Sequence, residues 1–333
     1  MKSLRAAVAL LLLLGPVDLL AQDSTTIRLG TILPTNSVWD KALKRMGSEW
    51  RQVTAGRVSL RVISGGVQGD ESTIIRRLRL NNPQAAALTQ PGLTQVSDVF
   101  NVFGIPFFFE SDEEAFHVLQ QLTPMFERAL GEAGLVLLNW GHGGWAHIFT
   151  ADQVSNLDDL RKTKIFTSSG DDQTTQWYKE NGFRPVPLAI TDVLMGLNTG
   201  LITAYPSPPY AALLLQWYRQ TPYMLDIPLG LVIGATVMTE RAWRRISAAD
   251  QTAILGVAQT MQDRLWADVP LQEREAVAEM KKRGLTIATI DLAAQKEFRA
   301  TADALTASMR GRMVPDAVYD LALRARNSFR ATQ

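Results

Sequence analysis

Hydrophobic and polar residues alternate along this chain with two different periods. Ile27, Leu29 and Leu33 keep to every second position, which predicts a strand. The apolar residues from Trp39 to Val53 recur about every 3.6 positions after Ser37, so a helix capped by this serine is predicted. Further predicted strands are 58–62, 85–89, 135–140, 146–150, 202–205 and 229–238, and further predicted helices are 70–80 and 112–130, the latter capped by Asp112. Alternating strands and helices favour an α/β fold.

One predicted helix is much longer than the others. It begins after Ser247 in a sequence like a capping box and ends at Gly284, a residue suited to the position after a helix C-terminus. About 35 residues give a length of roughly 54 Å. Pro270 lies inside and would clash with the carbonyl of Trp266. We therefore expect a kinked helix, made of two segments that meet near residues 266–269.

The N-terminal residues have the pattern of a secretory signal peptide. Lys2 and Arg5 precede an apolar run at 6–14, which is too short to span a bilayer, and the small Ala21 marks a cleavage site. The sequence contains no Cys, so no lipobox cysteine is available as an anchor. We predict export to the periplasm after removal of residues 1–21.

Composition restricts the class of protein further. The chain is 46% hydrophobic and 20% charged, which is typical of globular proteins. Removal of residues 1–21 leaves equal numbers of basic and acidic side chains, so nucleic acid is not an expected partner. Without Cys there are no disulfides, which fits a Gram-negative periplasm better than a small extracellular scaffold.

The usual signatures of catalysis and metal binding are missing. His142 and His147 flank two glycines, and neither Cys nor an acidic residue lies between 134 and 150, so no metal site is predicted. No nucleophile elbow, zinc-protease motif or P-loop occurs. Ser168 follows a strand and is interpreted first as part of a helix cap. We therefore predict neither an enzyme nor a bound cofactor.

Aromatic and proline residues cluster at two places. Trp140 and Trp145 flank a predicted glycine turn, and Tyr205, Pro206 and Pro208 follow a predicted strand. Single aromatic clusters belong to the core in most proteins, and that interpretation stays open here. Prolines at a strand end beside aromatics also fit the wall of an apolar pocket.

The stretch 157–218 contains the most informative motif. It reads D-D-L-R-K-T-K-I-F at 158–166, ends its next helix at Gly182, continues with P-V-P at 185–187 and closes in L-N-T-G at 197–200. This order resembles the solute-binding proteins of tripartite ATP-independent periplasmic (TRAP) transporters, dicarboxylate-binding type. Their pattern is D-L-x-G-x-K-I-R, a helix ending at Gly, P-V-P and L-x-x-G. Phe166 stands where the family has the Arg that holds the substrate carboxylate.

Upstream segments extend the resemblance over most of the chain. V-Q-G-D-E at 67–71, L-T at 88–89 and I-P-F-F-F at 105–109 are similar to family segments in the same order. The resemblance implies two lobes with a ligand cleft between them and a long helix spanning both. Lobe I would comprise 22–147 plus about 230–268, and lobe II 148–229 plus about 269–333. It also implies a small and a large permease subunit as membrane partners.

The resemblance places several residues at the cleft. Phe166 and the segment 205–208 would line it from one lobe, and Trp39 would line it from the other. Glu71, interpreted first as part of a helix start, is also a candidate polar contact. The predicted ligand-binding residues are Phe166, Trp39, Trp145, Trp140, Tyr205, Pro206, Pro208, Glu71, Thr89 and Ser168.

Three departures from the family pattern suggest an unusual ligand. Besides Phe166, Thr203 and Pro206 replace polar family residues. A buried carboxylate without its Arg loses a strong charge-assisted pair. We therefore predict a largely apolar ligand with one polar end. The alternative is an organic-acid binder in which another basic residue replaces the Arg: Arg79, Arg161, Lys162 or Arg184.

The predicted function is capture of a small molecule in the periplasm and its delivery to a TRAP-type permease. A sensor or a lipid-handling assembly that uses the same binding fold is a rival prediction. An enzyme on related lobes is a second rival, which lacks a visible catalytic set.

Overall fold

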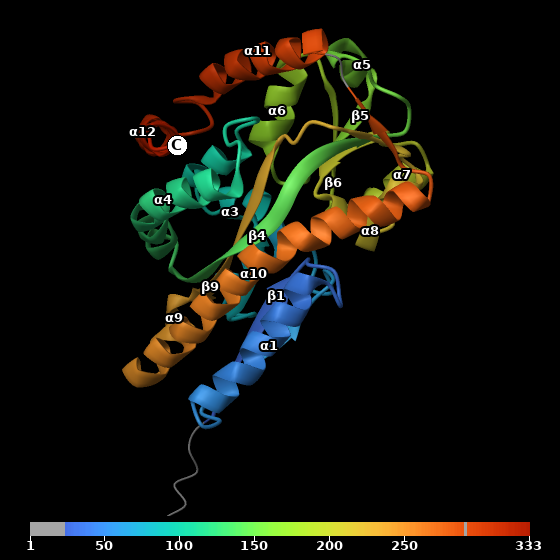
Figure 1. Cartoon of the computed structure of the whole chain (residues 1–333). Coiled ribbons are helices and arrows are strands. Elements are labelled where there is room, and N and C mark those ends of the chain that lie inside the picture. Colours follow the sequence, from blue (N-terminus) through green and yellow to red (C-terminus); the bar gives the residue numbers. More distant parts are fainter. Residues whose placement is uncertain (1–23, 290–291) are drawn as a thin grey trace, which may run out of the picture.

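The computed structural model describes residues 24–289 and 292–333 (Figure 1). In it, the segments in which apolar and polar residues alternate form the strands of one mixed sheet. The predicted signal peptide, 1–21, lies outside the described residues. The strands are β1 (Thr25–Thr31), β2 (Val58–Ile63), β3 (Ala85–Thr89), β4 (Leu135–Thr150), β5 (Lys164–Ser168), β6 (Arg184–Leu188), β7 (Ala204–Ser207), β8 (Tyr223–Leu225), β9 (Gly230–Thr239) and β10 (Thr286–Ala288). Their order is β2-β1-β3-β9-β4-β7-β5-β6, with β8 pairing both β4 and β10.

Helices cover both faces of this sheet. The α-helices are α1 (Val38–Val53), α2 (Glu71–Leu78), α3 (Gln90–Thr94), α4 (Asp112–Glu132), α5 (Leu157–Lys162), α6 (Asp172–Glu180), α7 (Val193–Asn198), α8 (Pro209–Leu214), α9 (Glu240–Trp243), α10 (Ala248–Lys282), α11 (Leu292–Met309) and α12 (Asp316–Arg330). Short 3-10 helices are η1 (Asp98–Gly104), η2 (Ile190–Asp192) and η3 (Trp217–Arg219). Within the described ranges, no helix is both long enough and apolar enough to cross a membrane.

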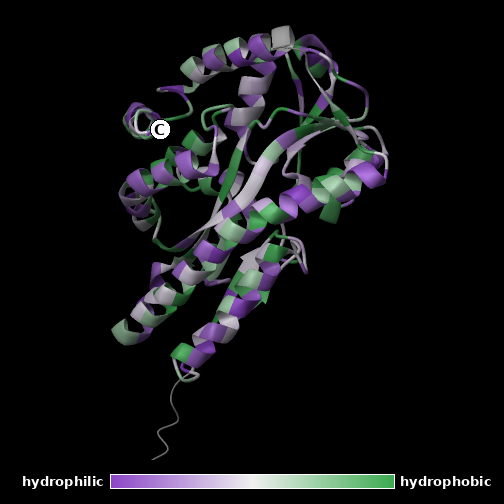
Figure 2. Ribbon diagram, in the orientation of Figure 1, coloured by the Kyte–Doolittle hydropathy of each residue, from purple (hydrophilic) through white to green (hydrophobic). Residues whose placement is uncertain are grey.

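Helix α1 confirms the helix predicted from the spacing of its apolar residues. Ser37 accepts a hydrogen bond from the Asp40 N–H and so caps α1, as predicted. One side of α1 is buried, with the side chains of Trp39, Leu43, Met46 and Trp50. Val53, the last member of the predicted stripe and the last residue of α1, is exposed. Figure 2 shows hydrophobic and hydrophilic residues alternating along α1 and α10, as expected for helices that bury one side.

Helix α4 begins at Asp112, although the predicted cap at Asp112 would place its first residue at 113. The Ser111 hydroxyl, rather than the carboxylate of Asp112, accepts the capping bond from the Glu114 N–H. Asp112 is the first helical residue, and its carboxylate accepts bonds from the Trp145 indole at 2.7 Å and from His142 at 3.1 Å. The carboxylate therefore ties α4 to β4.

The two strands predicted at 135–140 and 146–150 are one strand, so the predicted glycine turn between them is wrong. β4 runs from Leu135 to Thr150 and pairs with β9 along most of its length, with register shifts at 137/139 and 142/145. Gly144 has a φ of +97°, which a glycine adopts without strain, and it lies within the second shift. The glycines thus allow a bulge instead of a turn, and β4 joins the two halves of the sheet.

The long helix is continuous, so the prediction of two segments is wrong. α10 includes Pro270 without interruption and crosses the molecule beside β4 (Figure 1). Val269 and Ala276, on either side of the proline, are both buried. Packing on both sides therefore outweighs the backbone hydrogen bond that a proline cannot donate.

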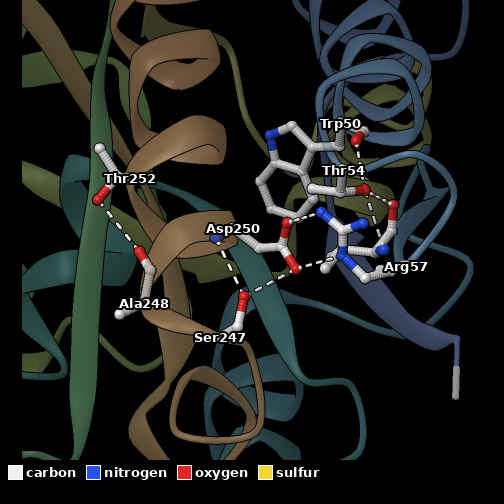
Figure 3. Close-up of polar contacts among 8 residues, drawn as sticks. Trp50, Thr54, Arg57, Ser247, Ala248, Asp250 and Thr252 are labelled. Carbon is white, nitrogen blue, oxygen red and sulfur yellow. Dashed lines mark hydrogen bonds and ion pairs between the residues drawn. The ribbon is translucent and has the colours of Figure 1, made fainter. Parts of the chain in front are cut away.

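The start of α10 is fixed by polar contacts to Arg57, the residue before β2 (Figure 3). Ser247 accepts a bond from the Asp250 N–H, as the capping-box sequence predicts. The Asp250 carboxylate in turn accepts two bonds from the Arg57 guanidinium, at 2.7 and 2.9 Å. A bidentate pair of this kind fixes orientation as well as distance.

Apolar side chains form separate cores in the two halves of the sheet. The half containing β1, β3 and β9 has one core toward α1 and α10 and another toward α4, and the half containing β5 and β7 has its own cores. Val318, Ala322 and Ala325 of α12 pack in the core that includes α4. These contacts favour assigning α12 to lobe I instead of lobe II, and the predicted lobe boundaries otherwise stay predictions.

Candidate functional site

A cavity of about 610 Å³ lies where the two halves of the sheet meet. It is bounded by residues at the carboxyl ends of β3, β5 and β7, by the N-terminal part of α1, and by β4 and β9. Ligands of open α/β sheets bind at such strand ends, and the volume suits a small molecule. We refer to it as the cleft cavity.

Six of the predicted site residues line the cleft cavity. They are Trp39, Thr89, Phe166, Ser168, Pro206 and Pro208. Two of them are aromatic side chains that come from opposite halves of the sheet. Phe166 lies on β5, with its ring centroid 6.5 Å from that of Trp217. Trp39 lies on α1, and its indole N–H donates to the His142 carbonyl at 2.9 Å.

Trp140 and Tyr205 do not line the cleft cavity. Trp140 packs against Phe100 and Phe126 in the core beneath α4. Tyr205 is fully buried and stacks on Phe149, and burial raises its pKa. Successive side chains of a strand point to opposite faces, so Tyr205 faces the core while Pro206 faces the cavity.

Glu71 lies behind the cavity wall and is not part of it. Its carboxylate accepts bonds from both the N–H and the hydroxyl of Thr89, each at 2.6 Å. Burial raises the pKa of Glu71 to about 7. Glu71 therefore acts on the site through Thr89, whose backbone it holds at the end of β3.

The cleft cavity has almost no charge. Among the residues that the structure describes, no Lys or Arg lines it, and Asp171 is the one acidic residue that does. The carboxylate of Asp171 accepts from the Thr174 N–H at 3.0 Å as the cap of α6, and burial raises its pKa. Burial likewise raises the pKa of Tyr178, another lining residue, to about 12. Tyr178 therefore stays uncharged at neutral pH.

None of the basic residues considered as replacements for the Arg lines the cleft cavity: Arg79, Arg161, Lys162 and Arg184. Arg161 pairs with Asp158 at 3.0 Å, and Lys162 pairs with Asp159 at 3.1 Å. Thr203 does not line the cavity either, and its hydroxyl accepts a hydrogen bond from the Lys164 N–H.

Several lining residues were missed by sequence reasoning. They are mostly apolar side chains of helices and loops, together with polar residues on β4 and η1: Asn101, Phe103, Asn139, Ile190, Leu194, Leu215, Trp217, Met261, Leu265, Met309 and Met313. Most lie in segments that read as ordinary core helices, so no local signal marks them. Trp217 lies within the motif stretch 157–218, but it was not among the predicted site residues.

A second cavity, of about 720 Å³, lies between β4, α10 and the loop before α4. Trp145 lines this cavity and not the cleft cavity. Its walls contain charges of both signs, with Glu273 and Arg274 from α10 and the Glu110–Arg299 pair at 3.8 Å. Burial raises the pKa of Glu273 to about 8. Within residues 24–289 and 292–333, no group of three or more His, Cys, Asp or Glu residues is placed to hold a metal ion.

Comparisons with known proteins agree with this architecture. A family model described as bacterial extracellular solute-binding protein, family 7, matches residues 29–312. The sialic acid-binding periplasmic protein of Vibrio cholerae is 19% identical over 289 residues, which cover 81% of this chain and 84% of that protein. The 2,3-diketo-L-gulonate-binding periplasmic protein of Escherichia coli is 21% identical over 277 residues, 83% of either chain.

Solved structures show the same fold. A TRAP periplasmic solute-binding protein from Haemophilus influenzae with bound L-gulonate has a TM-score of 0.84 at 19% identity, covering 91% of this chain and 99% of that one. A sugar acid-binding protein from Advenella mimigardefordensis in complex with galactonate has a TM-score of 0.86 at 17% identity, covering 92% and 99%. At these identities the likeness establishes the two-lobed fold with its long helix.

Proposed function

Because this chain belongs to family 7 of the bacterial extracellular solute-binding proteins, which serve TRAP transporters, we propose that its cleft cavity captures a largely apolar small molecule with one polar end. Members of the family are periplasmic binding proteins and not enzymes. We further propose that the molecule is delivered to a permease with a small and a large membrane subunit.

The observation that supports this ligand class is the lack of a cation in the wall of the described cleft cavity. Phe166 occupies the position at which the family resemblance expects an Arg. Transfer of a carboxylate into such a wall would remove its hydration without supplying a counter-charge. An apolar molecule would instead gain about 25 cal/mol for each Å² of apolar area removed from water.

The mechanism we propose is closure of the two halves of the sheet on the ligand. Phe166 and Pro206 line the cavity from one half, while Trp39 and Thr89 line it from the other. A molecule that contacts both walls stabilises the closed arrangement relative to an open one, since only the closed arrangement makes both sets of contacts.

The test is calorimetry on the wild type, on Phe166→Arg and on Phe166→Met. Native mass spectrometry of protein purified from its host first identifies the retained ligand, which is then used in the calorimetry. We expect Phe166→Arg to lower affinity for that ligand at least tenfold, since it places an unpaired charge in an apolar wall. Phe166→Met, which keeps the wall apolar, should change it by less than about threefold.

Binding of galacturonate, gulonate or succinate to the wild type at micromolar affinity would overturn the proposal and favour an organic-acid binder. We also propose that residues 1–21 are removed on export. N-terminal sequencing of the exported protein should then begin near Gln22. A histidine kinase gene beside this one, in place of permease genes, would favour the sensor.

A further inference from the structure

We propose that the polar end of the ligand is a protonated amine, and that helix α6 binds it with the carboxylate of Asp171 and the hydroxyl oxygen of Tyr178. The ligand is then an organic cation with an apolar body, and not an acid. This inference rests on the proposed function of the cleft cavity and names the chemistry of the one polar group.

One face of α6 forms part of the wall of the cleft cavity. Asp171, Thr174 and Tyr178 all line the cavity, and they follow one another at spacings of three and four residues. Residues at these spacings share one face of a helix. Helical side chains also lean toward the helix N-terminus, so the long side chain of Tyr178 extends back toward Asp171. This face of α6 therefore brings a carboxylate and a hydroxyl group to the same part of the wall.

Asp171 brings a charge to this face that no basic side chain balances. The Thr174 N–H donates to its Oδ1 at 3.0 Å, and no Lys, Arg or His among the described residues pairs with the carboxylate. A carboxylate has about four acceptor sites, so the cap leaves others unused. The residue is half-buried, and charges removed from water are usually paired. A cation that enters the cavity would supply the missing partner and favour the charged form of the carboxylate.

The Tyr178 hydroxyl is a second acceptor on this face. The Tyr178 ring packs edge-on against Trp177 and Phe183, with centroids 5.4 and 5.2 Å apart, which fixes the direction of its hydroxyl. No described residue makes a hydrogen bond with this hydroxyl, and its oxygen is not among the buried polar atoms that are closed to water. Burial and the charge of Asp171 raise the pKa of Tyr178 to about 12. The hydroxyl is therefore uncharged, and its oxygen accepts a hydrogen bond from an ammonium group.

The charge of Asp171 decides which polar group fits. A carboxylate of the ligand would meet a like charge there, with no Lys or Arg in the described wall to compensate. A hydroxyl group could donate to Asp171, but a hydrogen bond between two ions is stronger than one that involves a neutral donor. The cap alone does not need the charge, because Asn caps helices about as well as Asp. The wall therefore favours an amine over both an alcohol and an acid.

The experiment compares two probes that differ in the end group alone: 4-phenylbutylamine, which is protonated at neutral pH, and 4-phenylbutanol. Calorimetry at pH 7 measures binding of each to the purified protein. We expect the wild type to prefer the amine at least tenfold. Asp171→Asn removes the charge, keeps a capping residue and should abolish that preference. Asp172→Asn is the matched control and should keep it, because Asp172 is exposed and does not line the cavity.

Tyr178→Phe gives a second measurement, which stands if Asp171→Asn does not fold. It keeps the ring and removes the hydroxyl, so affinity for the amine should fall about three- to tenfold. Loss of the preference in Asp171→Asn, with unchanged affinity for the alcohol, supports the inference.

Three results would contradict the inference. Equal affinity of the wild type for amine and alcohol overturns it and leaves the apolar cavity standing. A preference for the amine that persists in Asp171→Asn, or affinity for the amine unchanged in Tyr178→Phe, shows that α6 does not bind the amine as proposed. A wild type that binds neither probe also overturns it, and if that protein binds galacturonate at micromolar affinity, the proposed function fails as well.

Discussion

Folding buries the carboxyl group of Glu71 without placing a basic side chain beside it. Its donors are the Thr89 N–H and hydroxyl and the Gly92 N–H, and burial outweighs them, so its pKa rises to about 7. An acid with a raised pKa in the folded state contributes full stability below its unfolded value, near 4.5. That contribution is lost as the pH rises through the folded value.

Glu71→Gln should remove this pH dependence while keeping an acceptor for the Thr89 N–H. Between pH 4.5 and pH 8 the wild type should lose, relative to the variant, on the order of 3 kcal/mol in free energy of unfolding. Urea unfolding at pH 4.5, 6 and 8 measures the difference. Glu132→Gln, at an exposed position of α4, is the control, and parallel pH curves for the wild type and Glu71→Gln would contradict the pKa of Glu71.

At the scale of single residues, the sequence predicted the site in part. Phe166, Pro206 and Pro208 were predicted because strand ends and family order place them at the cleft, and they line it. Tyr205 faces the core because one step along a strand changes the face. Asn139 also lines the cavity. It was not predicted, because no local pattern indicates the register shift beside it.

Among the elements, α10 carries in its first turn an ion pair to Arg57, the residue before β2, in addition to its apolar packing on α1 and β4. The side chain of Asp250 is 5% exposed, and the Arg57 guanidinium pairs with it in bidentate geometry (Figure 3). Removal of one partner leaves a charge in a poorly hydrated place, which costs more than the loss of an exposed pair.

Arg57→Met should therefore lower the free energy of unfolding by about 1–2 kcal/mol, reduced from the cost of a fully buried pair because Arg57 is partly exposed. Arg244→Met is the matched control, since it breaks the exposed Arg244–Glu240 pair and should cost less than about 0.5 kcal/mol. Chemical unfolding at neutral pH measures both. Equal losses in the two variants would mean that the Arg57 pair contributes no more than a surface contact.

Element prediction failed where tertiary packing overrode a local signal. The glycines at 143–144 predicted a turn, but pairing with β9 continues past them and turns the signal into a bulge. Pro270 predicted a kinked helix of two segments, but α10 is continuous and has buried residues on both sides of the proline. The strands and helices without such punctuation, such as α1 and β3, were predicted close to their observed bounds.

For the whole molecule, the order of family motifs predicted the architecture better than any local pattern did. Motifs spread from residue 67 to 218 predicted an α/β fold with two lobes and a long helix spanning both, and the structure has a sheet in two halves with α10 across it. The contacts between the halves could not be predicted, because they depend on side chains that are distant in sequence.

Gln173 makes the clearest of these contacts. From the start of α6, its amide accepts from Asn101 Nδ2 at 3.2 Å and donates to Asp98 Oδ1 at 3.3 Å, and both partners belong to η1 on the other side of the cleft. The two bonds connect the walls of the cavity. They therefore stabilise the arrangement in which a bound molecule contacts both halves.

Gln173→Ala should weaken binding of the ligand retained by the purified protein about three- to tenfold, because the closed arrangement loses two hydrogen bonds that an open one does not make. Gln176→Ala is the matched control, since the Gln176 amide donates to Glu180 within the same helix and does not cross the cleft. Calorimetry measures affinity, and small-angle scattering measures compaction on binding, which should be smaller for Gln173→Ala. If both variants bind and compact like the wild type, the contacts of Gln173 do not hold the halves together, and closure depends on the ligand and the cavity walls alone.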